Sequence, residues 1–416
     1  MRAVVALVGA ALVACAGGPS GSGADEVVFQ ASGDPEETAV YERLVAAFER
    51  AHPDVDVRFV PVADKDDHLA RLTTSFTGGN APDVFLVNFR EYSQFVARGA
   101  LEPVEPHLDD AGVSIGDYYP QPVEAFTYDG ALQCMPQNVS SLVVYYNVAL
   151  FEDAGVSPPL HGWTWEDFRR TALALTSDGV WGVGIEPSVV RLAPFVWSNG
   201  GELVDDLRRP TRFTLGEPAA RAALEFVVGL ARDDGVVPAE EDVAASEDLE
   251  NMFATGRLAM YLSSRRDTPV FREIPGLRWD VGPLPQAREP AGILHSDGYC
   301  LADGGDVEAA MRFVAFATGR RGQTITARGG RTVPSLRSVA QSPAFLDAGE
   351  PPANSQAFLA GIPYVRRTPV IPTWPEIEDV AEEILTRAFY DPGYTIDRAL
   401  GELDAQTTPL FTDALP

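Results

Sequence analysis

The spacing of apolar residues predicts alternating strands and helices near the start of the chain. Residues 26–30 form a short β-like run, 54–59 alternate strictly, and 81–87 read as a buried strand. A second helical stretch covers 65–76. The first helix is marked by an apolar stripe at helical spacing, Val40, Leu44, Val45 and Phe48. This order is typical of a parallel sheet with helices on both faces, so we predict an α/β fold.

Start signals support the first helix. Asp34 can act as the N-cap, Pro35 suits the first helical position, and Glu37 stands at the third position. Together Asp34 and Glu37 predict a capping box, in which each side chain bonds the other's backbone N–H.

A second capping pattern lies near the middle of the chain. Thr164 is predicted as an N-cap with Asp167 three residues later, and Trp163 with Phe168 can form a hydrophobic staple around it. We therefore interpret Trp163 and Trp165 as structural residues and not as ligand-stacking rings.

The first residues are typical of a secretion signal. Arg2 precedes an apolar run of ~12 residues, which is too short to span a bilayer but suits a signal-peptide core. Leu-Val-Ala-Cys at 12–15 resembles the lipobox of bacterial lipoproteins. We expect residues 1–14 to be the signal peptide, Cys15 to be lipidated, and 15–25 to be a flexible tether. The alternative is an ordinary secretory signal with an incidental cysteine.

The net charge of the chain argues against some classes of binding partner, and its length indicates the number of domains. The formal net charge is −28, and Lys65 is the only lysine. Such a body is unsuited to binding nucleic acid or an anionic membrane surface. A chain of 416 residues is long enough for two or more domains.

The sequence contains no recognisable catalytic motif. The five histidines show no metal-binding spacing, and the sequence has neither a G-x-S-x-G elbow nor a Walker loop. We predict no metal, no cofactor and no enzymatic activity. Carboxylate pairs meet only in space, so a secreted carbohydrate-active enzyme stays open as a distant alternative.

Several segments together carry a family resemblance. YYNVALFEDAG followed by PPLHGWTWEDF resembles the signature of family 1 extracellular solute-binding proteins, the maltose-binding-protein-like group of bacterial ABC transporters. Further segments match in the expected order: AFERAHPDVDVRF, APDVFLVNFREYSQFVARGALEPV, NGGELV, MFATGRLAMYL, WDVGPLP and GGRTVPSL. The resemblance covers nearly all of residues 26–416.

The resemblance implies a two-lobed periplasmic-binding-protein-like fold of type II, with ligand bound between the lobes. Lobe 1 would hold 26–136 and 298–338, and lobe 2 would hold 139–296 and 343–416. The chain would cross between them near Met135–Asn138, Asp297–Cys300 and Val333–Gln341.

The resemblance also implies a function. The protein would be a monomer that captures an oligosaccharide or related sugar by lobe closure and delivers it to ABC permease subunits. It would be held at the outer face of the membrane by its lipid anchor. A tethered adhesin or receptor accessory shares this fold and differs only in its partner.

Candidate ligand contacts lie at strand ends, at the first crossing and at family positions. Asp34 follows the first strand, although its capping role explains it equally well. Trp374 opens a late helix, and the family resemblance implies that its ring stacks on the sugar. The alternative is that it packs under that helix. The remaining candidates are Asn88 and Phe89 after the third strand, and Gln137, Asn138 and Ser140 at the first crossing.

One position departs from the family pattern. Where many members carry a sugar-stacking tryptophan, this chain has Arg266 beside Arg265. A guanidinium can lie flat against a sugar ring or bind an anion. The alternative ligand is therefore an anionic polyol, such as glycerol phosphate or a glycerophosphodiester.

The family resemblance also implies a pairing of the two cysteines other than Cys15. Cys134 and Cys300 lie in the segments that the resemblance carries across the lobes, and export would place them in an oxidising compartment. We expect a Cys134–Cys300 disulfide at the hinge. Two buried free thiols are the alternative.

Overall fold

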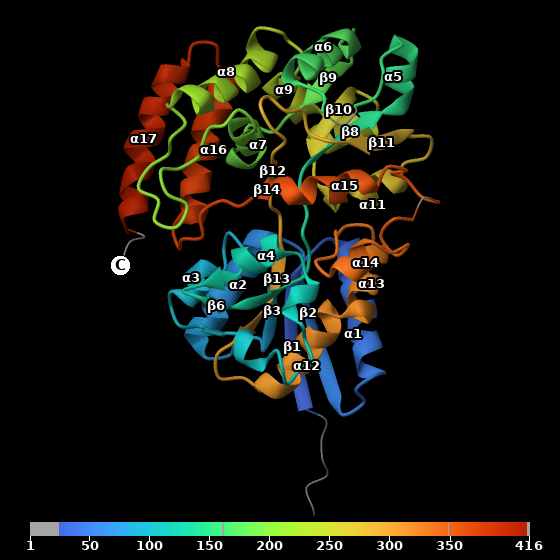
Figure 1. The fold of residues 1–416 in the computed structure, drawn as a ribbon, viewed down its shortest axis with the longest axis vertical. Helices are drawn as coiled ribbons and strands as arrows, with labels where there is room; N and C mark the ends of the chain where they lie inside the picture. Colours follow the sequence, from blue (N-terminus) through green and yellow to red (C-terminus); the bar gives the residue numbers. More distant parts are fainter. Residues whose placement is uncertain (1–24, 160–161, 348, 414–416) are drawn as a thin grey trace, which may run out of the picture.

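The computed structural model describes residues 25–159, 162–347 and 349–413. Figure 1 shows two lobes stacked along the long axis, joined by segments that run between them. The predicted signal peptide, Cys15 and nearly all of the predicted tether lie outside the described residues. Within the described ranges, no helix has both the length and the apolar character needed to cross a bilayer.

Lobe 1 is a mixed sheet between two layers of helices. The strand order is β2-β1-β3-β13-β4, with β7 also paired to β13. β2 and β3 run parallel to β1, whereas β13 is antiparallel to its neighbours β3, β4 and β7. The strands of this sheet are β1 (Asp25–Ser32), β2 (Val55–Val62), β3 (Val84–Asn88), β4 (Leu101–Glu102), β7 (Cys134–Pro136) and β13 (Asp297–Ala302).

The helices of lobe 1 cover both faces of this sheet, as the alternating pattern predicts (Figure 1). They are α1 (Pro35–Glu49), α2 (Lys65–Gly78), α3 (Ser93–Val96), α4 (Pro120–Ala125), α12 (Val307–Thr318), α13 (Arg320–Arg328) and α14 (Arg337–Ala340). A small hairpin of β5 (Thr127–Tyr128) and β6 (Ala131–Leu132) precedes β7.

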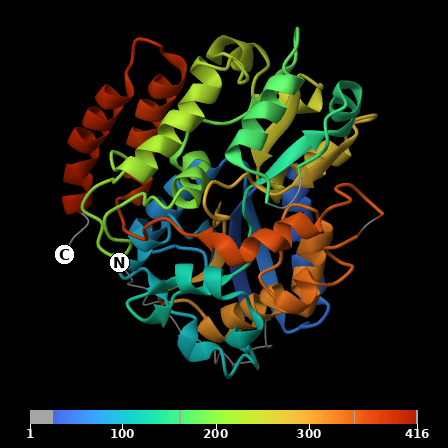
Figure 2. The ribbon, with the colours of Figure 1, turned by 45° about the horizontal axis from the view of Figure 1, so that its top comes forward.

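Lobe 2 is built on a second sheet with the order β11-β8-β10-β9. Its strands are β8 (Val143–Asn147), β9 (Trp181–Gly184), β10 (Leu258–Ser263) and β11 (Trp279–Gly282), and β12 (Gly292–Ile293) pairs separately with β14 (Val365–Arg366). Its helices are α5 (Val148–Ala154), α6 (Trp165–Leu175), α7 (Val189–Ser198), α8 (Pro218–Arg232), α9 (Glu240–Ala245), α10 (Leu249–Ala254), α11 (Thr268–Arg272), α15 (Gln356–Gly361), α16 (Trp374–Tyr390) and α17 (Ile396–Asp413). Figure 2 shows α16 and α17 side by side at one edge of this lobe.

Two clusters of buried apolar side chains form the hydrophobic core of the protein. One fills lobe 1 and continues onto one face of the lobe 2 sheet, where it includes Tyr145. The other packs α6, α7, α8, α16 and α17 against the opposite face, which includes Val144. Since neighbouring residues of a strand point to opposite faces, β8 contributes to both clusters.

The predicted caps are confirmed in one helix and half confirmed in the other. Thr164 and Asp167 exchange both bonds of the capping box, and Trp163 meets Phe168 edge-on with ring centroids 5.4 Å apart. At α1, Asp34 accepts a hydrogen bond from the Glu37 N–H at 2.8 Å. The expected return bond from the Asp34 N–H to the Glu37 side chain does not form, because the Glu37 carboxylate points toward the lobe interface.

The chain passes between the lobes near β7, near β13 and after α14. The chain leaves lobe 1 after β7 and returns at β13, which begins at Asp297. Pro334 pairs with Asn138 beside the first crossing, but the chain then enters α14, which lies next to α13 in lobe 1 (Figure 1). The segment from Gln341 onward leads from α14 to α15 of lobe 2.

The disulfide between Cys134 and Cys300 is present, with its Cα atoms 4.3 Å apart. The two residues face each other on the paired strands β7 and β13. The pairing is confirmed, but its expected position is corrected: the bridge lies inside the lobe 1 sheet next to the hinge and does not join the two lobes.

Candidate functional site

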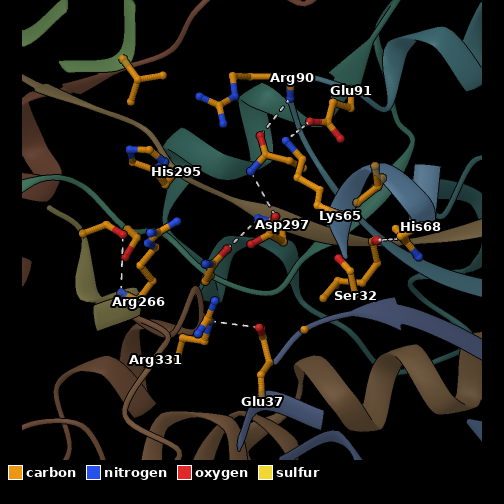
Figure 3. Close-up of a pocket in the computed structure, with 18 of the residues that line it drawn as sticks. Ser32, Glu37, Lys65, His68, Arg90, Glu91, Arg266, His295, Asp297 and Arg331 are labelled. Carbon is orange, nitrogen blue, oxygen red and sulfur yellow. Dashed lines mark hydrogen bonds and ion pairs between the residues drawn. The ribbon is translucent and has the colours of Figure 1, made fainter. Parts of the chain in front are cut away.

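A cleft of about 620 Å³ lies between the lobes. Lobe 1 contributes the ends of β1 and β3 and the start of α2, and lobe 2 contributes the starts of α7 and α16 and the segment after β10. The hinge strands form its floor. Among the described residues, the lining has no phenylalanine, tyrosine or tryptophan, and it is dominated by charged and amide side chains (Figure 3).

Hinge residues form a polar network at the centre of the floor. Pairing of β3 with β13 places Asn88 opposite Asp297, and Asn88 Nδ2 donates to Asp297 Oδ1 at 3.1 Å. Asn138 Oδ1 in turn accepts from the Asp297 N–H at 2.7 Å. Within the described part of the chain, the Asp297 carboxylate makes no ion pair, although it lines the cleft. It is therefore an acceptor available to a ligand.

Ion pairs line the lobe 1 wall. Arg331 Nε lies 2.9 Å from Glu37 Oε2, and its guanidinium also pairs with Asp34. The Tyr41 hydroxyl donates to Glu37 at 2.9 Å. Burial raises the pKa of Glu37 to about 7, outweighing the attraction of Arg331 and the hydrogen bond from Tyr41.

The lobe 2 wall carries arginines and an acidic helix start. Arg191 lies 2.7 Å from Glu186, and Arg266 lies 2.9 Å from the buried Asp267. The first three turns of α16 present Glu378, Asp379 and Glu382 to the cleft. Burial and the nearby carboxylates raise the pKa of Glu382.

His295 occupies the hinge between these walls. Its backbone pairs with Ser140 at the first crossing. Burial lowers the pKa of His295 well below its usual value, and Arg90, Arg191 and Arg266 lower it further. The imidazole is therefore neutral near neutral pH.

The structure brings most of the predicted residues together and leaves others out. The ones that line the cleft are Asp34, Asn88, Asn138, Ser140 and Arg266. Asp34 both caps α1 and faces the cleft, so its capping role is compatible with a role as a ligand contact.

Three candidates need correction because they lie beneath the surface. Phe89 is fully buried in the lobe 1 core. Gln137 points inward and donates to the hydroxyls of Tyr41 and Tyr299. Trp374 is also fully buried.

Trp374 packs as a core residue of lobe 2. Its exposed fraction is 0 %, and its ring centroid lies 6.0 Å from that of Phe213 and 6.3 Å from that of Phe411. Arg265, which suggested an anionic ligand together with Arg266, is also buried, with its guanidinium over the Phe345 ring at 4.3 Å. Of these two arginines only Arg266 lines the cleft.

Several cleft residues escaped the sequence analysis. Arg331 lies in the GGRTVPSL segment and Asp297 lies at the second crossing. Both segments carry the family resemblance, but no local sequence pattern marks either residue as part of the cleft. The others are Lys65, Glu91, Arg90, Arg191, His295 and Glu378. Lobe packing, which no short sequence window encodes, brings them together.

Comparison with known proteins identifies the family. Residues 32–324 match the family model of the bacterial extracellular solute-binding proteins. The chain belongs to this family. The fold agrees: an ABC substrate-binding protein of Listeria monocytogenes, solved in complex with cycloalternan, superposes on this solute-binding protein with a TM-score of 0.83. It is 26% identical, and the match covers 93% of this chain and 99% of that one.

Curated relatives are similar over most of their length. The mannitol-binding protein of Pseudomonas aeruginosa is 25% identical over 342 residues, which covers 79% of this solute-binding protein and 74% of the relative. An uncharacterized lipoprotein of Streptomyces antibioticus is 25% identical over 365 residues, covering 84% and 79%.

Proposed function

We propose that this solute-binding protein is the lipid-anchored receptor of an ABC importer and captures a hydroxyl-rich solute, a sugar or polyol, by closure of its lobes. The observation that carries the proposal is the cleft floor, where Asn88, Asn138 and Asp297 present amide and carboxylate groups between the two lobes. Such groups donate to and accept from hydroxyls at fixed positions. Contacts from both lobes favour the closed state, because a ligand can make them together only after closure.

The relatives support this ligand class and this partner. The Pseudomonas relative is a mannitol-binding protein, and the Listeria protein is an ABC substrate-binding protein in complex with cycloalternan. The lack of aromatic rings in the described cleft lining favours recognition by hydrogen bonds over stacking. This feature distinguishes the site from the stacking platform that we expected at Trp374.

A binding screen tests the proposed ligand class. Purified protein should be stabilised against heating by one or more members of a panel of sugars and polyols, since a ligand that binds only the folded state raises its stability. Asp297→Asn should weaken binding of that ligand about ten-fold or more, as expected for a hydrogen bond to a charged group.

The matched control is Asp303→Asn, because Asp303 is exposed in the turn just after the same strand. It should bind like the unaltered protein. The proposal fails if no member of the panel binds, or if Asp297→Asn binds as tightly as Asp303→Asn.

We also propose that Cys15 carries the membrane anchor. The relative in Streptomyces antibioticus is a lipoprotein, and the lipobox-like residues 12–15 precede the first strand at Asp25. Two or more acyl chains hold a protein firmly to a bilayer, whereas one binds reversibly. Cys15→Ala should therefore move the protein from the membrane fraction to the soluble fraction. Unchanged partitioning of a correctly processed chain would contradict the anchor.

A further inference from the structure

Three arginines and a histidine gather beside the hinge, although the whole chain is strongly acidic. Arg90 follows β3 in lobe 1, Arg191 lies in α7 and Arg266 follows β10 in lobe 2, and His295 lies on the hinge segment. The formal net charge of the chain is −28. Among the residues that the structure describes, eight carboxylates also line the cleft, so what distinguishes these arginines is their position beside the hinge and not an excess of positive charge.

Each arginine uses only part of its donor set. Arg90 lies 3.6 Å from Glu378, which is too long for a hydrogen bond, and Arg191 contacts Glu186 through Nη2. Arg266 contacts Asp267 through Nε. These carboxylates orient the guanidinium groups but leave other N–H groups, of the five that each arginine carries, for a further partner.

Several of the unused polar atoms are deeply buried. Arg191 is only 6 % exposed, yet its Nε has no hydrogen-bond partner among the described residues. The same holds for Nε and Nη1 of Arg90 and for Nε2 of His295, and all three residues line the cleft. Thr332, which is 7 % exposed and also lines the cleft, has an unpartnered hydroxyl. Buried polar groups without partners are costly, so this cluster is built to meet a bound group.

Positively charged side chains of both lobes act on His295. After burial, the largest influences on the pKa of His295 are the positive charges of Arg90, Arg191, Arg266 and Lys65, all of which lower it. A group bound beside His295 would meet guanidinium groups from both lobes at once, because Arg90 of lobe 1 and Arg191 and Arg266 of lobe 2 line the same cleft.

We propose that this cluster, Arg90, Arg191, Arg266 and His295, is an anion subsite that binds a phosphate or carboxylate group on the polyol ligand. The proposal rests on the proposed function and specifies its ligand class. Guanidinium groups bind phosphate and carboxylate through paired N–H donors, and these charge-assisted bonds are stronger than bonds to neutral hydroxyls. Because the arginines come from both lobes, the anion would also hold the cleft closed.

The first experiment uses inorganic phosphate as the probe. Phosphate should raise the melting temperature of the purified protein above that in sodium chloride of equal ionic strength. The rise should be lost in Arg191→Gln and in Arg266→Gln. Arg266 serves as the second variant because its side chain is 54% exposed, and a glutamine there keeps an N–H donor for the buried Asp267. The matched control is Arg328→Gln at the exposed end of α13, which should keep the full rise.

The second experiment separates the two kinds of anion. Calorimetry compares glycerol 3-phosphate with glycerol, and glucuronate with glucose. The charged member of at least one pair should bind about ten-fold or more tightly than its neutral partner, and Arg266→Gln should remove that preference.

The inference is overturned if phosphate gives no rise beyond that in sodium chloride, or if the rise persists in both cleft variants. It is also overturned if the charged and neutral members of each pair bind equally. Binding of a neutral sugar in that case would leave the proposed function intact. Stabilisation by phosphate without binding of any sugar or polyol would instead contradict the proposed function alone.

Discussion

Arg90 Nε lies 3.6 Å from Glu378 Oε2 across the cleft, which links the loop after β3 in lobe 1 to the start of α16 in lobe 2. Both side chains are largely buried, with exposed fractions of 13% and 18%. The pair is a direct electrostatic contact between the lobes, so it affects the balance between closed and open states.

We predict that Glu378→Gln shifts the ligand-free protein toward more open conformations. A shielded ion pair contributes on the order of 1 kcal/mol, which corresponds to about a five-fold change in the ratio of the two states. Small-angle X-ray scattering should show a larger radius of gyration than for Glu383→Gln, a control on the exposed side of the same helix. Equal radii for the two variants would show that the pair does not influence closure.

Trp374 is expected to act on stability and not on ligand recognition. Trp374→Ala should lower the free energy of unfolding by about 3–5 kcal/mol, because it removes a buried ring that packs near Phe213 and Phe411. Urea unfolding measures this loss, and Trp374→Phe should cost less. Ligand affinity of the folded fraction should be unchanged. A stable Trp374→Ala protein with weakened binding would return the residue to the site.

The disulfide should stabilise lobe 1 without affecting the ligand site. Cys134 and Cys300 are 166 residues apart in sequence, and in the chain-entropy model a loop of that length is worth up to about 5 kcal/mol. The double variant Cys134→Ala, Cys300→Ala should therefore unfold at lower urea concentration and keep its ligand affinity.

Peptide mapping without reductant checks the bond itself. The peptides that contain Cys134 and Cys300 should be recovered linked, and they should separate after reduction. Recovery of both thiols as alkylated, unlinked peptides from the unreduced protein would contradict the disulfide.

Glu37 should make stability depend on pH. Its pKa is raised from 4.5 to about 7 in the folded protein, so the native state keeps a proton that the unfolded state releases in this range. The resulting stabilisation is complete below pH 4.5 and is lost as the pH rises through 7. Relative to Glu37→Gln, the unaltered protein should lose roughly 1–3 kcal/mol of stability across that interval.

Urea unfolding of both proteins across the interval from pH 4.5 to 7 measures this difference. Glu36→Gln serves as the control, because Glu36 is exposed in the same helical turn. If the difference between the unaltered protein and Glu37→Gln is independent of pH, the Glu37 carboxyl does not titrate as inferred.

Local patterns in the sequence predicted the elements well. The apolar stripe of α1, the alternation in β2 and the cap at Thr164 all appear in the structure, since each depends on residues within a few positions of one another. The family resemblance added the two-lobed arrangement and the Cys134–Cys300 pair, which are separated too widely for any local pattern to join.

The candidate site was predicted only in part. Asn88 and Ser140 were placed correctly because strand ends and crossings face the cleft in this fold. Phe89 and Gln137 are direct neighbours of cleft residues but point into the core: Phe89 packs there from the turn after β3, and Gln137 bonds to Tyr41 and Tyr299. Burial of Trp374 depends on α17, which packs over it from the far end of the chain.

The sequence by itself determined the order of helices and strands, the family and the polar character of the strand ends, because these follow from short-range periodicity and recognisable motifs. Only the tertiary structure decided which charges meet. Arg90 and Glu378 are far apart in the chain and are brought together by the approach of the two lobes, whereas Arg191 and His295 meet through the folding of lobe 2 against the hinge. Electrostatic contacts of this kind depend on distance in space, which the linear order of residues does not specify.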